Sequence, residues 1–213
     1  MPVDASSPLL VRTPAPFAEE SLLGYVLRVS AENGYDTPRH VFKLAGISAG
    51  KMFSAGLSTE HLRTVLGGRE RLVPSSYGLD GDADGVSIRG HSLGKSASAG
   101  YLRLRKPSFC PQCVQEKGYI DAFWDLTAAV ACPTHKRVQL RQCPTCSAPL
   151  NWLRPGLLTC RCGESLLSPS LEPVDEAVAE LMGLIRAKLM GQPLVSQANS
   201  SGFPVAQLEA LSL

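Results

Sequence analysis

The sequence predicts a mainly α fold with small β ribbons. An N-terminal helix-turn-helix-like helical bundle is expected to precede a cysteine-rich module, and a C-terminal helix to follow it. Three observations predict this class: apolar residues recur at helical spacing near both ends, all seven cysteines lie within residues 110–162, and glycine and proline interrupt the remainder. The chain has 213 residues and is 44% hydrophobic, enough for one or two domains with a buried core.

Composition divides the chain into five predicted parts. Four prolines favour an extended arm over residues 1–18, and residues 19–73 read as a helical domain. Residues 74–100 are rich in Gly, Ser and Asp and predict a flexible connector. The cysteine-rich module occupies residues 101–168, and a helical segment occupies residues 169–213.

The first helix is predicted from Glu19 to the Asn33-Gly34 pair, which provides a stop signal. Glu19 and Glu20 would stand in its first turn, where carboxylates favour the helix dipole. Its apolar positions are Leu22, Leu23, Val26, Leu27 and Val29.

Two shorter helices should follow. Thr37 and Pro38 predict a cap and first position for the second, and Ser58 can cap the third. Three short helices joined by tight turns are compatible with a DNA-reading helix-turn-helix and equally with any small helical bundle. The possible phosphate contacts are Arg39, Lys43, Arg63 and Arg69, although a solvated charged face is the favoured interpretation.

Residues 101–106 alternate apolar and basic side chains, as an edge strand would. Their basic members Arg103, Arg105 and Lys106 are candidate nucleic-acid contacts. The alternative is that they offset the negative charge of nearby thiolates.

The cysteines form the strongest pattern. Three of four close pairs have two intervening residues, a spacing that lets a tight turn aim both ligands at one metal ion. The fourth pair has one intervening residue, and Gly163 should relieve the backbone there. Taken in sequence order, the pairs predict two structural zinc ions in a tandem zinc-finger module. The ligands are Cys110, Cys113, Cys132 and His135 for the first Zn²⁺, and Cys143, Cys146, Cys160 and Cys162 for the second.

Other interpretations of the cysteines are weaker. Seven is an odd number for a disulfide framework, and the close pairs could cross-link nothing distant. Interleaved sites, with the first and third pairs sharing one ion, stay open. Each predicted ion already has four protein ligands, so neither an open zinc position nor a free thiolate is expected for an enzyme.

Between the first two ligand pairs lies the only dense aromatic group. We expect it to fill the core between the fingers, with a stacking platform for bases as the alternative. Its members are Tyr119, Ile120, Phe123, Trp124 and Leu126. A final helix, with an apolar stripe from Val174 to Leu189 and a stop at Gly191, should pack on the domain or on a partner.

Charge and hydropathy limit the function. The formal charge is +2, and the cysteine-rich module has nine basic and four acidic side chains. Two zinc ions on seven thiolates would lower its charge by about three, so a non-specific polyelectrolyte binder is not expected. No apolar run could span a membrane, and Met1–Arg12 does not resemble an export signal. We therefore expect a cytoplasmic protein, where thiols stay reduced.

Several motifs, in order, resemble the TniQ/TnsD family of transposition proteins. The resemblance covers roughly residues 14–165 and includes all eight predicted zinc ligands. It rests on Glu20-Ser21-Leu22-Leu23-Gly24-Tyr25-Val26-Leu27-Arg28, Phe109-Cys110-Pro111-Gln112-Cys113, Trp124, Cys132-Pro133-Thr134-His135 and Leu140-Arg141-Gln142-Cys143-Pro144-Thr145-Cys146. The glycine-rich connector and the lack of a long C-terminal region depart from longer members.

The resemblance implies a non-enzymatic target selector with a helix-turn-helix-like part followed by zinc fingers. Such proteins join a target to an AAA+ ATPase regulator (TnsC/TniB-like) that recruits the transposase. The target is DNA recognised directly or through a CRISPR guide-RNA effector complex. The alternative is an independent, sequence-specific DNA-binding regulator that uses its helices and fingers. Whether the chain forms a homodimer stays open.

Overall fold

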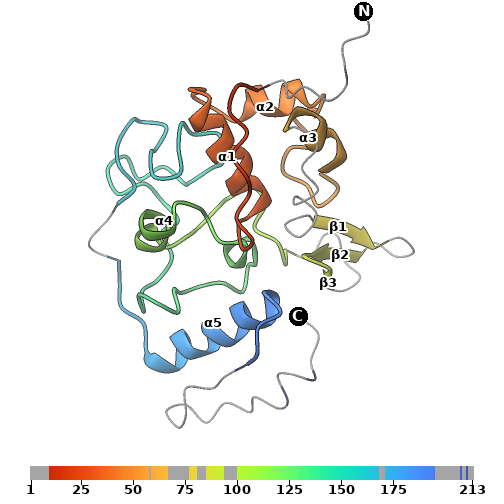
Figure 1. The fold of residues 1–213 in the computed structure, drawn as a ribbon. Coiled ribbons are helices and arrows are strands. Elements are labelled where there is room, and N and C mark those ends of the chain that lie inside the picture. Colours follow the sequence, from red (N-terminus) through yellow and green to blue (C-terminus); the bar gives the residue numbers. More distant parts are fainter. Residues whose placement is uncertain are drawn as a thin grey trace, which may run out of the picture.

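The computed structural model describes residues 10–57, 59–66, 77–80, 85–93, 100–167 and 171–194, together with positions 207 and 210. Helix α1 runs through the middle, with α2 and α3 on one side, α4 and long loops on the other, and α5 across the base (Figure 1). The elements are α1 (Leu22–Glu32), α2 (Arg39–Leu44), α3 (Thr59–Val65), β1 (Tyr77–Asp80), β2 (Gly85–Ile88), β3 (His91–Ser92), α4 (Pro111–Lys117), the 3₁₀ helix η2 (Ala122–Asp125) and α5 (Glu176–Leu189).

Helix α1 is the central element because nine consecutive residues, Leu22 to Ser30, are buried. Its cap is Ser21, whose hydroxyl accepts from the Gly24 amide at 3.3 Å. The helix ends at Glu32, Asn33 is its C-cap, and Gly34 follows with φ of 73°. The stop was predicted correctly.

The predicted start of α1 was wrong by three residues. Glu19 and Glu20 precede the cap instead of forming the first turn. Glu20 is completely buried and forms a bidentate ion pair with Arg28, at 2.8 Å from Nε and 2.7 Å from Nη2. The Arg28 guanidinium also donates to the Ala15 carbonyl at 3.0 Å and lies over the Phe17 ring. This pair therefore fastens the described end of the N-terminal arm against α1.

Helices α2 and α3 occur in the predicted order. Pro38, not Thr37, occupies the cap position of α2, and the buried Thr37 hydroxyl has no hydrogen-bond partner. The predicted cap of α3, Ser58, and the candidate contact Arg69 lie outside the described residues. A DNA-reading arrangement of these helices stays a prediction.

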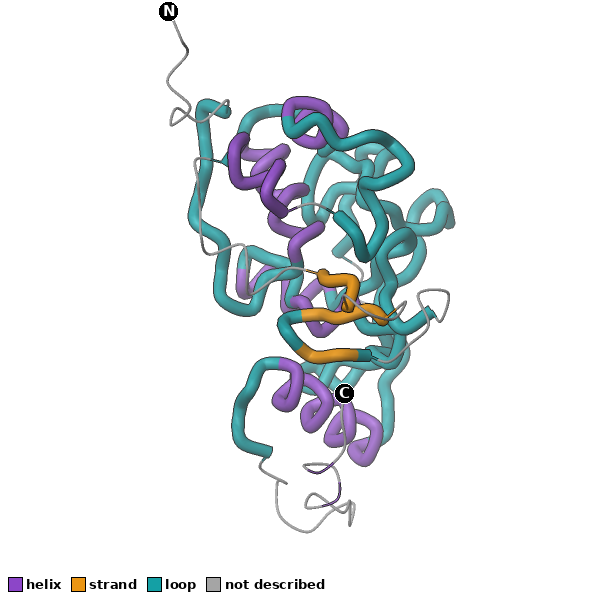
Figure 2. Tube along the Cα trace, turned by 90° about the vertical axis from the view of Figure 1, so that its right-hand side faces the viewer, coloured by secondary structure: helices purple, strands orange, loops and turns teal. Residues whose placement is uncertain are grey.

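The predicted flexible connector contains a small antiparallel sheet of order β1-β2-β3. Tyr77 pairs with Ile88 and Leu79 with Val86. Tyr77, Val86 and Ile88 are buried, so three short strands stand within the segment that the sequence predicted as a flexible connector. In Figure 2 the sheet lies between the N-terminal helices and α5.

The helical part and the cysteine-rich part share one continuous core, although the sequence predicted them as separate units. Residues 19–21 pair with residues 120–122 through the Ser21 amide to the Ile120 carbonyl, 2.8 Å, and the Ala122 amide to the Glu19 carbonyl, 2.8 Å. A side chain at Gly24 would put its Cβ 3.1 Å from the Ile120 Cβ. The glycine thus permits close packing of α1 on this segment.

Four of the five members of the aromatic group are buried as predicted, but in a core that also includes α1 and is not confined to the fingers. Ile120, Phe123, Trp124 and Leu126 are buried in the core that includes α1. Tyr119 instead stacks on Phe17, with ring centroids 4.7 Å apart.

Helix α5 packs back on the protein, as predicted. Ala179, Met182 and Leu189 are buried, and Gly191 follows the helix with φ of 63°. Arg186 donates through Nε to the Asp121 carboxylate at 2.9 Å and also pairs with Glu19. No helix among the described residues combines the length and apolar character that crossing a membrane requires.

Asp125 joins three elements at the centre of this core. Its carboxylate accepts from the Ser21 hydroxyl at 3.0 Å and from the Tyr77 hydroxyl at 2.9 Å, so it links α1, η2 and β1. Burial raises the pKa of Asp125 to about 7, against the opposing effect of these two hydrogen bonds. Below about pH 7 the folded protein therefore favours the protonated carboxyl of Asp125, whereas the unfolded chain does so only below its ordinary pKa of 3.8.

Asp125→Asn should reduce the pH dependence of stability. The unfolded chain loses this proton near its ordinary pKa of 3.8 and the folded chain near 7. Stability from the protonated group is thus complete below the lower value and is lost as pH rises toward the upper one, by up to about 1.4 kcal/mol per pH unit. Urea unfolding of both proteins at about pH 5 and about pH 7, with excess metal, measures this difference. An equal pH dependence in the two proteins would contradict the assignment.

Candidate metal centres

The first cluster brings Cys110, Cys113, Cys132 and His135 together, with all ligand atoms of the cluster within 4.8 Å of one another. Cys110 caps α4, and Cys113 lies in its first turn after Pro111. The helix N-terminus is a favourable place for thiolates because its free amides carry partial positive charge. The other two ligands stand on the turn at 132–135, which follows η2.

Distances in this cluster fit a tetrahedral ion. The His135 Nδ1 lies 3.4 Å from the Cys110 sulfur, 3.2 Å from that of Cys113 and 3.5 Å from that of Cys132. Metal–sulfur bonds of about 2.3 Å and metal–nitrogen bonds of about 2.0 Å give a tetrahedral S–N edge of about 3.5 Å. His135 would therefore present Nδ1 to a bound ion.

Glu116 supports the imidazole from the opposite side. Its carboxylate lies 3.0 Å from His135 Nε2, so it can accept the proton that ligation through Nδ1 leaves there. This contact was missed from the sequence. The signal was its position on α4, one turn after the cysteine pair, where a side chain reaches back toward the ligand site.

The second cluster contains Cys143, Cys146, Cys160 and Cys162, again with all ligand atoms within 4.8 Å of one another. The sulfurs of Cys143 and Cys162 are 3.8 Å apart, as are those of Cys146 and Cys160. Four metal–sulfur bonds of about 2.3 Å predict tetrahedral edges of about 3.8 Å. The shortened last pair thus completes a four-ligand set, and the pairs are grouped sequentially rather than interleaved.

Three of the ligand turns share one backbone device. The residue after the second ligand has positive φ: 51° at Lys136, 58° at Ser147 and 89° at Gly163. Each of these amides closes its turn, by donating to the carbonyl of Cys132 at 3.0 Å, Cys143 at 2.9 Å or Cys160 at 3.0 Å. The role predicted for Gly163 is confirmed. Lys136 and Ser147 gave no such signal, because non-glycine residues seldom adopt this conformation.

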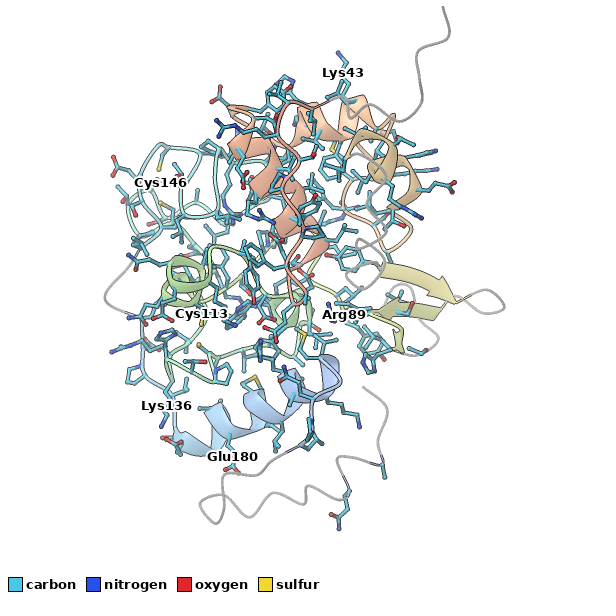
Figure 3. All side chains as sticks on the ribbon, viewed as in Figure 1. Lys43, Arg89, Cys113, Lys136, Cys146 and Glu180 are labelled. Carbon is cyan, nitrogen blue, oxygen red and sulfur yellow. The ribbon has the colours of Figure 1, made fainter. Side chains whose placement is uncertain are left out.

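The two clusters differ in exposure. Cys110, Cys113 and Cys132 are buried, whereas Cys146 and Cys162 are exposed. Figure 3 shows Cys113 at α4 and Cys146 on the long loops above that helix. Both clusters could hold a metal ion with four protein ligands, which leaves no coordination position for a substrate or a catalytic water.

Arg154 supplies a buried positive charge beside the second cluster. It is only 1% exposed, and its guanidinium donates to the carbonyls of Asn151 at 2.6 Å, Gly156 at 3.0 Å and Leu157 at 3.2 Å. It also lies 5.2 Å from the centroid of the Phe109 ring.

No described carboxylate pairs with Arg154. Burial lowers its pKa to about 9, and the charge of Cys160 opposes that shift. A divalent ion with four thiolates carries a net charge of about −2, so a filled second centre would provide the missing counter-charge.

The predicted nucleic-acid contacts divide into two groups. Arg39, Lys43, Arg105 and Lys106 are exposed. Arg103 is 9% exposed, and its guanidinium donates to Gln139 Oε1 at 2.5 Å and to the Thr127 carbonyl at 2.8 Å. Arg103 is thus largely buried, and its contact with nucleic acid stays a prediction. Its neighbours Arg105 and Lys106 remain free to contact a partner.

Arg154→Met should weaken metal binding at the second centre, by about tenfold, since support residues of metal sites typically contribute this much. Arg154→Lys keeps the charge and should weaken it less. Competition titrations with Co²⁺ follow each centre separately, because four-thiolate and three-thiolate-imidazole coordination absorb differently. Arg161→Met is the matched control, since Arg161 is an exposed cation between Cys160 and Cys162. Equal weakening by the two methionine variants would contradict the role of Arg154.

The TniQ family model matches residues 11–140, which include α1 to α4 and the complete first cluster. No curated protein matches the sequence. The match covers more than half of the chain and confirms the predicted resemblance. The chain belongs to the TniQ family, whose members take part in transposition.

Proposed function

We propose that this chain is a transposition target-selection adaptor whose two clusters hold structural Zn²⁺. It would link a target to an AAA+ ATPase regulator that recruits the transposase. The family match carries the proposal, because it covers the helical part and the first centre as one continuous unit. The target would be DNA that is recognised directly or through a CRISPR guide-RNA effector complex.

The geometry of the clusters supports an adaptor without chemistry of its own. Thiolate and imidazole ligands at tetrahedral separations suit Zn²⁺, which has no redox chemistry. With four protein ligands on each ion, zinc would stabilise the fold and would not activate water. A single body with one shared core is suited to docking two partners in fixed relative positions.

The alternative is an independent DNA-binding regulator. The exposed positions of Arg39 and Lys43 on α2 favour it. It requires the isolated chain to prefer one DNA sequence clearly, and alanine at either residue to weaken that preference by about 1–3 kcal/mol if the side chain reads a base.

The adaptor proposal predicts a ternary assembly. The zinc-loaded chain should co-sediment with the AAA+ regulator encoded beside the transposase, on DNA and with a non-hydrolysable ATP analogue. Chelated protein should lose this association, because metal binding to structural zinc sites contributes directly to folding. A control with the regulator and DNA alone gives the background. Absence of association in every nucleotide state would contradict the adaptor function.

A further inference from the structure

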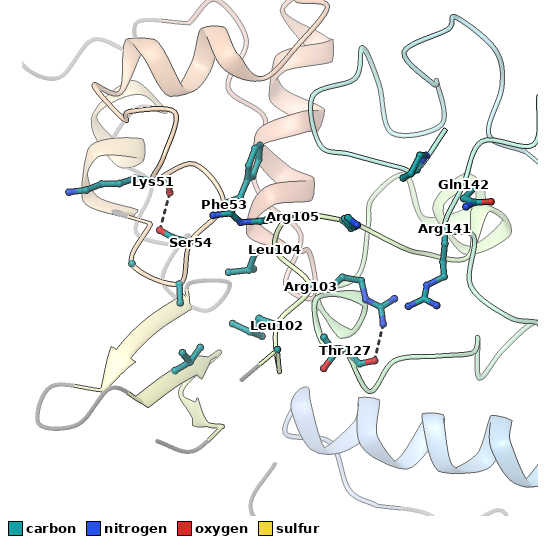
Figure 4. Close-up of a pocket in the computed structure, with 16 residues that line it drawn as sticks. Lys51, Phe53, Ser54, Leu102, Arg103, Leu104, Arg105, Thr127, Arg141 and Gln142 are labelled. Atoms are coloured by element: carbon teal, nitrogen blue, oxygen red, sulfur yellow. Dashed lines mark hydrogen bonds between the residues drawn. The ribbon is translucent and has the colours of Figure 1, made fainter. Parts of the chain in front are cut away.

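An open groove of about 1190 Å³ separates the loop after α2 from the chain that enters the first metal centre. Figure 4 shows Lys51 on one wall and Arg141 on the opposite wall, with Leu102 and Leu104 between them. The walls therefore come from the helical part and from the cysteine-rich part. The groove exists only when both are packed in their shared core.

The described lining of this groove is basic and contains no carboxylate. Its cations are Lys51, Arg103, Arg105, Lys106 and Arg141. All of them except Arg103 are exposed, and none of these four forms an ion pair with a described carboxylate. Some cations elsewhere on the described surface are paired, as Lys136 is with Glu176 at 2.6 Å, whereas others, such as Lys43 and Arg161, have no described ion pair. Unpaired cations gathered in a hollow concentrate positive potential there.

Arg103 is a largely buried residue of the groove lining, and its charge adds to the positive potential of the groove. Its guanidinium is fixed by Gln139 and Thr127, as described above, and Figure 4 shows it directed toward Arg141. Burial, and after it the charge of Arg141, lowers the pKa of Arg103. The two like charges repel each other, and a bound anion would relieve the repulsion.

The shape and lining favour a helical polyanion over an unstacked strand. Single strands are held largely by stacking of bases on aromatic rings. Phe53 is the only described aromatic residue in the lining, and its ring already meets Phe42 edge-on, 6.1 Å between centroids. Phosphate contacts from lysine and arginine, without base stacking, are typical of duplex backbone binding.

We propose that this groove receives the phosphate backbone of duplex DNA without reading its sequence. The inference deepens the proposed function, because it assigns the target DNA to a surface, and it rests on that function for the identity of the polyanion. The groove lies apart from α2, where Figure 3 shows Lys43 at the outer end of the molecule. Arg39 lines a separate hollow that also contains Asp36. Those residues lack the concentration of unopposed charge that the groove has.

Binding of zinc-loaded full-length chain to random-sequence duplex DNA tests the proposal. With four exposed cations on phosphates, the logarithm of affinity should fall with the logarithm of salt concentration with a slope of about −3 to −4. Arg105→Ala with Lys106→Ala should reduce the slope by about 1.8 and weaken binding about tenfold at low salt, equally for all sequences. Lys43→Ala with Arg39→Ala removes the same charge from α2 and should change neither quantity.

Several outcomes would overturn the groove assignment. They are tighter binding of single-stranded DNA than duplex, loss of binding in the α2 double variant alone, and no duplex binding at low salt. Loss of regulator binding by the Arg105 and Lys106 variant in the absence of DNA would assign the groove to an acidic protein surface instead. Because regulator association is measured separately, failure of the groove leaves the adaptor function standing, and failure of the adaptor leaves the groove measurable.

Discussion

The fold depends on crowding eight ligand atoms into two small volumes. Seven thiols and one imidazole stand at tetrahedral separations, where thiolates would repel one another without a cation. Outside α4 and η2, the chain from residue 110 to 162 is held by isolated bridges such as Phe109 to Leu140 and Gln142 to Pro149. We therefore propose that metal coordination is the interaction that fixes these loops. The ordered loops in turn provide the surface against which the side chains of α1 are buried.

The family motif around α1 has a structural explanation. Ser21 caps the helix and donates to Asp125, Gly24 lets Ile120 approach, and Arg28 pairs with buried Glu20. These contacts join the helix to the arm and to the segment between the first two ligand pairs. Buried ion pairs contribute little net stability compared with well-packed apolar residues. We infer that the motif sets the angle between the helical part and the metal centres, and hence the shape of the basic groove.

Sequence reasoning succeeded where the determining interactions are local. Ligand spacing gave both clusters, and an amphipathic stripe with a terminal glycine gave α5. It failed where distant partners decide. The strands at 77–80, 85–88 and 91–92 were not predicted because their segment is rich in Gly, Ser and Asp, and the burial of Tyr77 and Ile88 depends on strand pairing and on contacts with the distant core. Arg103 occupies a basic position in an alternating apolar and basic pattern, which is typical of a surface residue. Its guanidinium is nevertheless buried, where it donates a hydrogen bond to Gln139, 36 positions later. The shared core likewise depends on residues 19–21 meeting residues 120–122, a contact that no local pattern encodes.

Amide hydrogen exchange of α1, before and after complete chelation, tests the central claim most directly, together with the metal content of the purified chain. The account predicts two zinc ions per chain. It also predicts that amides within Leu22–Glu32 lose their protection when both ions are removed, although none of these residues is a ligand. Fewer than two zinc ions, or a fully protected helix in metal-free protein, would contradict the claim that metal coordination holds the scaffold together.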